Sequence, residues 1–243
     1  MSELDSMPLT EHLRELRTRI IRSFGGILLA TLVCYYFSDK IFEVLREPIR
    51  KYLPTGGLVF TAPVDKFMAF LKVSFFAGLI ASCPWWLFQI WQFVAPGLYA
   101  KEKKYGLIFI SSGTVLFMIG VCFAYFLAVP AAFEFLMTFG GDADKPMITI
   151  DHYLSFLTTF LVMFGMAFEL PLVIVILGMM GIVSQEFLRS KRRYIIVILS
   201  IVSAIVTPPD VISMTIMLVP LYLLFEISVL IVGRFERQPE GSA

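Results

Sequence analysis

Long apolar runs separated by short polar segments dominate the pattern along the chain. A helix needs about 20 largely apolar residues to cross a bilayer. Six runs are candidates for such spans: 20–37, 67–88, 106–129, 153–180, 194–206 and 211–232. The pattern therefore predicts an all-α, polytopic membrane protein that forms one integral membrane domain over 1–243. Residues 1–19 precede the first span, and 233–243 form a tail.

The fifth and sixth runs are expected to form short helices. Run 194–206 makes a helix of about 20 Å, whereas the hydrocarbon core of a bilayer is roughly 30 Å thick. Glu226 interrupts the sixth run, so its strictly apolar part, 211–225, is about 22 Å long. Between the two runs, the segment 207–210 (Thr-Pro-Pro-Asp) favours a tight turn over one long broken helix. Such a hairpin must thin the bilayer or lie behind its neighbours.

The segments outside the runs carry patterns of their own. An apolar stripe at helical spacing precedes the first run and predicts a helix that lies at the membrane surface and continues into the span. The stripe consists of Leu9, Leu13, Leu16 and Ile20. In the loop after the first run, charged residues at near-helical spacing indicate a short surface helix.

Lys and Arg are distributed unevenly among the segments. They concentrate before the first run, after the second, after the fourth and in the tail. Because cytoplasmic segments are enriched in basic residues, both termini are expected in the cytoplasm, with the first and third loops outside.

Composition narrows the class of protein. The chain is 58% hydrophobic with a mean hydropathy of +0.82, whereas soluble domains average about 45–50% apolar residues. The net charge of +1 argues against a nucleic-acid partner. The three cysteines lie widely spaced in apolar runs, which supports neither a disulfide framework nor a metal site. No cofactor is expected. Residues 1–19 are too charged for a cleavable signal peptide.

One carboxylate lies inside the fourth run. Glu169 is followed by Pro171, which lacks an N–H and crowds the carbonyl of Ala167, so the helix should bend there. A charged side chain at membrane depth costs about 2.5–3.5 kcal/mol on insertion scales. Glu169 is therefore expected to face a partner or a wet cavity. The plain alternative is a carboxyl satisfied by a neighbouring helix or water, without a functional role.

Two other classes of protein, a membrane enzyme and a small-solute transporter, fit the sequence less well. A membrane enzyme needs convergent catalytic groups, but the only histidines, His12 and His152, fall on opposite predicted sides, and no catalytic motif is present. The chain is therefore not expected to be an enzyme. A proton-coupled small-solute secondary transporter would also carry an intramembrane Glu and Pro. It would usually show internal repeats, and this sequence has none.

Two carboxylates lie on the predicted cytoplasmic side. Glu15 is one turn before Arg19, so a weak intrahelical pair is one interpretation. Glu102 lies among three lysines, and the simple interpretation is that its negative charge balances theirs. Alternatively, the two carboxylates could grip a ligand that bears two guanidinium groups, because Arg–carboxylate pairs are bidentate and directional.

The chain resembles the TatC family, the multi-spanning component of the twin-arginine protein translocase. Five segments in order carry the resemblance, which runs from about residue 8 to 232. They are 13–17 (LRELR), 93–98 (FVAPGL) with Glu102, 164–171 (FGMAFELP), 207–210 (TPPD) and 225–226 (FE). The resemblance implies a concave, glove-like bundle in a bacterial or archaeal-type cytoplasmic (inner) membrane.

The resemblance also implies a function and partners. TatC-like proteins bind twin-arginine signal peptides of folded cargo and assemble with TatA- and TatB-type single-span proteins, in a complex expected to hold several copies. Transport is expected to draw on the proton gradient. The implied signal-peptide-binding residues are Glu15, Arg17, Phe93, Leu98 and Glu102.

Further residues are implied in partner contacts. Glu169 and Pro171 are expected to face a groove that meets the single-span proteins, and Thr207 lies where relatives dock a partner helix. Met214 stands where many relatives carry Gln, which suggests an apolar contact instead. Pro48 in the outer loop matches a family position associated with function, although the fixed φ of proline explains it equally well.

Overall fold

The computed structural model describes residues 9–53, 57–97, 106–139, 147–207 and 210–236. Its regular elements in these ranges are helices, apart from one isolated parallel bridge between Val59 and Thr149. The all-α prediction is confirmed.

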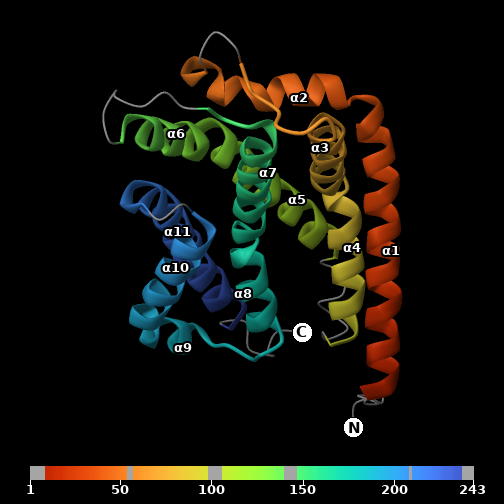
Figure 1. Cartoon of the computed structure of the whole chain (residues 1–243). Helices are drawn as coiled ribbons and strands as arrows, with labels where there is room; N and C mark the ends of the chain where they lie inside the picture. The colour runs from red at the N-terminus through yellow and green to blue at the C-terminus, as the bar shows by residue number, and fades with distance from the viewer. Residues whose placement is uncertain (1–8, 54–56, 98–105, 140–146, 208–209, 237–243) are drawn as a thin grey trace.

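Helix α1 (Leu9–Tyr36) is one unbroken helix of 28 residues. The sequence predicted that its first part lies at the membrane surface. The helix does continue into the apolar run, as expected (Figure 1), whereas its position at the membrane surface stays a prediction. Leu13, a member of the apolar stripe, is 60% exposed. The stripe therefore does not mark a buried face within this chain.

The second run is not a single helix. It divides into α3 (Asp65–Ala81) and α4 (Cys83–Val94), which meet at an angle of 54°. Pro84 lies in the first turn of α4, where its missing N–H and its ring prevent an undisturbed continuation from α3. The prediction of one helix over 67–88 therefore missed this bend.

The third run extends beyond its predicted end. Helix α5 (Gly106–Phe123) passes through a π-helical turn, η4 (Ala124–Ala128), into α6 (Val129–Thr138). Pro130 lies in the first turn of α6, directly after the π-helical turn, where the helical hydrogen-bond ladder must adapt to a residue without an N–H. The helical segment therefore reaches residue 138, not 129.

The fourth run contains the predicted bend. Helix α7 (Ile150–Ala167) ends at Phe168, and α8 (Leu170–Met179) begins after Glu169, with Pro171 in its first turn. Thr149 caps α7 by accepting a hydrogen bond from the His152 N–H. The run is helical from Ile150, three residues earlier than expected.

The last two runs form helices of very different length. Helix α9 (Gln185–Ser190) precedes α10 (Arg192–Val206), which has 15 residues, whereas α11 (Val211–Glu236) has 26. At 1.5 Å per residue α11 is about 39 Å long, so the prediction of a short sixth helix is wrong. The predicted turn at Pro208 and Pro209 lies outside the described residues.

Glu226 does not interrupt α11 because both its oxygens are hydrogen-bonded. Arg192 at the start of α10 lies 2.7 Å from one oxygen, and the Tyr222 hydroxyl donates to the other at 2.9 Å. A paired carboxylate is tolerated inside a helix that is otherwise apolar.

Within the described residues, four helical segments are long and apolar enough to cross a membrane, and the bent pair α3–α4 would make a fifth. The four are Thr10–Tyr36, Gly106–Thr138, Ile150–Met179 and Val211–Arg234. With only 15 residues, α10 falls short of this length. Each of the six runs is thus helical, whereas six complete spans stay a prediction, as does the orientation.

The loop after α1 contains the predicted surface helix. Helix α2 (Ser38–Arg46) and the 3₁₀ helix η1 (Glu47–Tyr52), which carries Pro48 in its first turn, lie across the end of the bundle (Figure 1). The hydroxyl of Tyr125 donates to the Val44 carbonyl at 2.6 Å, and that of Tyr153 donates to the Leu45 carbonyl. These bonds fix α2 onto η4 and α7.

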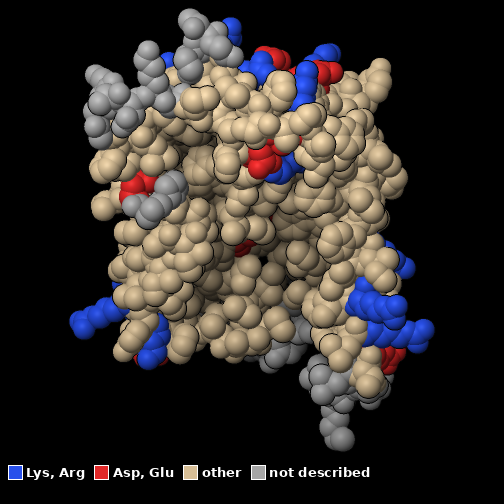
Figure 2. All heavy atoms as spheres, viewed as in Figure 1, with Lys and Arg blue, Asp and Glu red and all other residues tan. Residues whose placement is uncertain are grey.

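The core lies around α7, whose side chains pack against α3, α5 and η4. Phe117, Phe160 and Phe164 are among its largest fully buried side chains. On one side stand α1, α3 and α4, and on the other α9, α10 and α11 (Figure 1). The face between them is hollowed, as Figure 2 shows. The concave shape is confirmed.

Candidate functional site

The first candidate site lies where the N-terminal half of α1 meets the end of α4. Arg19 Nη2 donates to Glu15 Oε1 at 3.1 Å, and the two side chains are only about one-fifth exposed, at 19% and 21%. The intrahelical pair inferred from the spacing is therefore present.

Arg19 also reaches across to α4. Its Nη1 donates to the side-chain oxygen of Gln92 and lies 3.5 Å from that of Gln89, which is buried. The link between Arg19 and the two glutamines was not predicted from the sequence. Two glutamines three apart in an apolar run, on one face of a helix, were the available signal. The surface thus holds one guanidinium group with a carboxylate and two amides.

Phe93 belongs to the same surface. Its ring stacks on His12 of α1, with centroids 4.4 Å apart and an interplanar angle of 20°. Arg17 is exposed on α1. The fold therefore brings Glu15 and Phe93 together from elements far apart in sequence, whereas Leu98 and Glu102 lie outside the described residues. We call Glu15, Arg19, Gln92, Phe93 and His12 the α1–α4 surface.

A small apolar groove continues from this surface along α1. Its volume is about 170 Å³, and Ile20, Phe24 and Ile27 of α1 face Ile90 of α4 across it. A charged group held at Glu15 would therefore have an apolar surface beside it.

The second candidate site is the break between α7 and α8. Glu169 is 92% buried, and neither carboxylate oxygen has a hydrogen-bond partner among the described residues. A methyl group added at Gly113 of α5 would lie 3.2 Å from Oε2 and 3.0 Å from Leu87 of α4. The carboxyl thus lies in an apolar environment between three helices, and Pro171 beside it is also buried.

The remaining predicted residues lie on other elements. Thr207 is buried at the end of α10, and its hydroxyl donates to the Ser203 carbonyl at 2.8 Å. That bond satisfies the hydroxyl without a partner chain. Met214 is half-buried on α11, and Pro48 is half-buried in η1. The structure does not bring these three residues together with the α1–α4 surface.

A further polar cluster was not predicted. Lys72 of α3 donates to Asp151 Oδ1 and to Ser155 Oγ of α7, both at 2.6 Å. It ties α3 to α7. In the part of the chain that the structure describes, no group of three or more His, Cys, Asp or Glu side chains is placed to hold a metal ion.

Comparison with known proteins gives a consistent result. A family model described as Sec-independent protein translocase protein (TatC) matches residues 11–220. The TatC protein of Aquifex aeolicus is 40% identical over 92% of this chain and 93% of its own length. That of Escherichia coli K12 is 39% identical over 94% and 89%, respectively.

Solved structures agree with the sequence matches. A crystal structure described as twin arginine translocase receptor TatC superposes with a TM-score of 0.79 at 37% identity, covering 93% of this chain and all of that one. A second, of TatC in DDM, has a TM-score of 0.80 at 38% identity, over 90% and 98% of the two chains. With the same helical fold and sequence similarity over nearly its whole length, the chain belongs to the TatC family of Sec-independent protein translocase proteins.

Proposed function

We propose that this subunit of the twin-arginine translocase is the receptor that binds twin-arginine signal peptides of folded cargo. Glu15 and Glu102 are the carboxylates that receive the two guanidinium groups. Arg17, Phe93 and Leu98 line the same site.

The guanidinium group of Arg19 in the α1–α4 surface is the observation that carries the proposal. It donates hydrogen bonds to side-chain oxygens of Glu15 and Gln92, so this surface already carries acceptors in positions that suit a guanidinium group. A partly exposed ion pair is worth about 1 kcal/mol or less, so an arginine of the cargo can replace Arg19 at Glu15 at little cost. When the cargo arginine replaces it at Glu15, Arg19 retains its hydrogen bonds to the side-chain oxygens of the two glutamines.

Selectivity for arginine follows from the same geometry. A guanidinium offers a planar fork of donors that matches a carboxylate, whereas the ammonium of lysine is a compact point charge. Changing both arginines of a signal peptide to lysine keeps the charge but loses this fit.

Partner recruitment is assigned to the second site. Glu169 has two buried oxygens without a partner among the described residues, so a polar group of a TatA- or TatB-type single-span helix would satisfy it. Hydrogen bonds between membrane helices average about 0.6 kcal/mol, which suits a reversible contact. Pro171, Thr207 and Met214 are proposed to flank the docking helix. Pro48 is proposed to support the outer end of the bundle.

The membrane setting completes the proposal. Both termini and the α1–α4 surface face the cytoplasm, and several copies assemble in the active complex of the cytoplasmic membrane. Moving one charge through 100 mV yields about 2.3 kcal/mol, so the proton gradient is the proposed source of work. The folded cargo crosses with the help of many partner helices.

The deciding experiment is signal-peptide binding to the purified full-length protein. We expect the twin-arginine peptide to bind at least tenfold more tightly than its twin-lysine version. Glu15→Ala/Glu102→Ala should abolish that preference. Glu11→Ala is the matched control, because Glu11 is an exposed acid on the same helix with no ion pair among the described residues.

Two results would count against the receptor function. One is equal affinity for the two peptides. The other is an unchanged preference in the double variant, which would mean that the carboxylates only balance local charge. A proton-driven uptake of a small solute that does not need Glu15 would then point to the transporter class.

A further inference from the structure

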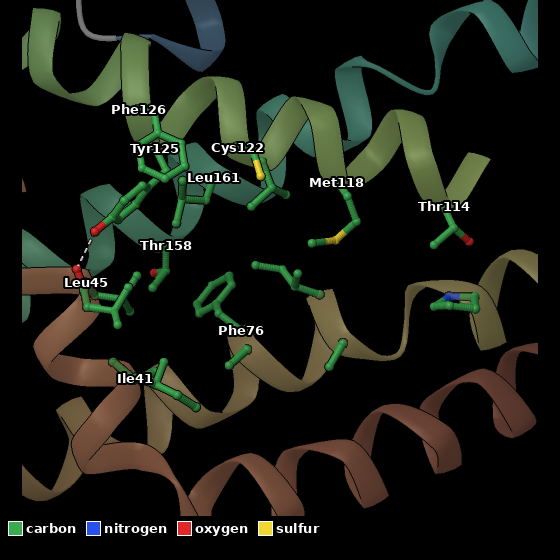
Figure 3. A pocket seen from close by; sticks show the side chains of 17 residues that line it. Ile41, Leu45, Phe76, Thr114, Met118, Cys122, Tyr125, Phe126, Thr158 and Leu161 are labelled. Carbon is green, nitrogen blue, oxygen red and sulfur yellow. Dashed lines mark hydrogen bonds between the residues drawn. The ribbon is translucent and has the colours of Figure 1, made fainter. Parts of the chain in front are cut away.

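A large apolar groove lies between α3 and α5. Its Thr114 end adjoins Gly113, which lies beside the Glu169 carboxyl. The volume of the groove is about 570 Å³, a size typical of small-ligand pockets. We call it the α3–α5 groove. Residues of α3 and α5 form its walls, α7 contributes its floor, and α2 covers one end (Figure 3).

The groove runs along the helices over a defined length. Lining side chains extend along α5 and η4 from Thr114 to Phe126, which is about 18 Å at 1.5 Å per residue. Ile41 and Leu45 of α2 mark one end, and Pro84 lies at the other, where α3 bends into α4. The hydrocarbon core of a bilayer is roughly 30 Å thick. The groove therefore spans about one leaflet.

The hydroxyl groups that line the groove already donate their hydrogen bonds within the protein. The hydroxyls of Thr114 and Thr158 donate to backbone carbonyls of their own helices, at 2.7 and 2.5 Å. The Tyr125 hydroxyl is bound to the Val44 carbonyl. No Asp, Glu, Lys or Arg of the described residues lines the groove. A polar or charged ligand would find no partner, so the occupant must be apolar.

The groove has an exposed rim. Phe126 is 73% exposed and Val44 59% exposed at its rim, and Cys122 is also exposed. Since the chain is an integral membrane protein, the medium at this rim is hydrocarbon. An empty apolar channel would lose dispersion contacts along its whole length.

We propose that the α3–α5 groove binds one acyl chain of a phospholipid from the leaflet on the α2 side. A single leaflet contains one layer of acyl chains, and the groove has that length. A partner helix fits less well, because it must continue through both leaflets, whereas the groove stops at Pro84. The bound chain fills the space that the bend between α3 and α4 opens beside α5.

The test uses depth-specific photolabelling of the full-length protein in phosphatidylethanolamine–phosphatidylglycerol vesicles. One phospholipid probe carries a diazirine near the end of its acyl chain, and a second carries it near the headgroup. We expect the first to label Thr114 and Met118, and the second to label Phe126 and Val44. Labelled residues are located by mass spectrometry.

Filling variants make the test specific. Ala77→Phe, on the α3 wall, should lower labelling of Met118 and Cys122 at least fivefold while labelling of Ile119 is unchanged, since Ile119 is exposed outside the groove. Ala81→Leu at the exposed end of α3 fills the groove with less risk to folding. Val115→Phe, an exposed position on α5 outside the groove, is the matched control.

Two outcomes would overturn the proposal. One is labelling of groove residues that does not depend on the depth of the diazirine. The other is equal labelling of Met118 and Ile119 in the wild type and in both filled variants, which would mean that the groove exchanges lipid like any other part of the surface.

Discussion

The side chains that matter most here are charged groups whose surroundings differ sharply. Glu15 has a guanidinium partner, Glu226 has two partners, and Glu169 has none among the described residues. A buried polar group without a partner costs stability, and natural proteins keep such groups mainly where a partner or reaction needs them. The unpaired state of Glu169 is therefore the strongest residue-level argument for contact with another chain.

Replacing Glu169 should separate stability from function. We expect Glu169→Leu to raise the free energy of unfolding by about 1–3 kcal/mol, because it removes an unsatisfied buried group. The same variant should lose association with single-span partners and keep twin-arginine peptide binding. Thermal unfolding in detergent and co-purification of the partners are the measurements.

The control for this variant is Glu134→Leu, an exposed carboxylate on α6. Its unfolding temperature should stay close to that of the wild type. If Glu169→Leu instead abolished peptide binding, the two sites would not be independent, and the separate roles assigned to them would have to be given up.

At the scale of elements, close helix packing and helix breaks shape the bundle. Helix α1 packs along α3, where Gly78 lies so near Thr31 that an added methyl group would come within 2.6 Å of backbone and side-chain atoms. The break at Ser82 then turns α4 by 54°, and α4 carries Gln89, Gln92 and Phe93. The α1–α4 surface depends on both features.

Glycine substitutions on α1 and α3 should have opposite effects. Gly78→Ala is expected to destabilise the protein by about 1–3 kcal/mol, because the new methyl group overpacks the α1–α3 contact. Gly25→Ala, with nothing within 4 Å of its new methyl group, should stabilise α1 by about 0.5–1 kcal/mol. Thermal unfolding of both variants in the same detergent compares them, and effects of equal sign would contradict the packing argument.

The whole molecule is a hollowed bundle, and on the face shown in Figure 2 most of the charged side chains lie toward its two ends. Helix α1 alone is about 42 Å long at 1.5 Å per residue, which exceeds the roughly 30 Å hydrocarbon core. Part of α1 must then project from the hydrocarbon, and we expect its N-terminal turns, with His12 and Glu15, to be that part. Helix α2 lies at the other end of α1 (Figure 1), so we expect α2 and the N-terminal turns of α1 to face opposite sides of the membrane.

Thiol labelling tests that arrangement. In a variant whose native cysteines are replaced by serine, Glu11→Cys should react with a membrane-impermeant maleimide only in inside-out vesicles, and Glu43→Cys only in right-side-out vesicles. The cysteine-free parent is the control. Labelling of both positions from one side would rule out the orientation inferred from the Lys and Arg distribution.

Local patterns in the sequence determined a large part of this fold. The apolar runs predicted the helices, Pro171 predicted the break beside Glu169, and the motif order indicated the family. Each of these signals depends on near neighbours along the chain: the N–H that a proline lacks, or the length of an apolar stretch. They needed no knowledge of which helices touch.

Only the tertiary structure decided the contacts between helices. It placed Arg19 on Gln92, paired Glu226 with Arg192 so that α11 continues past the expected end, and joined Lys72 to Asp151. In a membrane protein the lipid-facing and protein-facing sides of a helix are both apolar, so periodicity does not mark the packed face. Partner choice among polar side chains then depends on how the helices are arranged in space, which hydropathy along the chain does not encode.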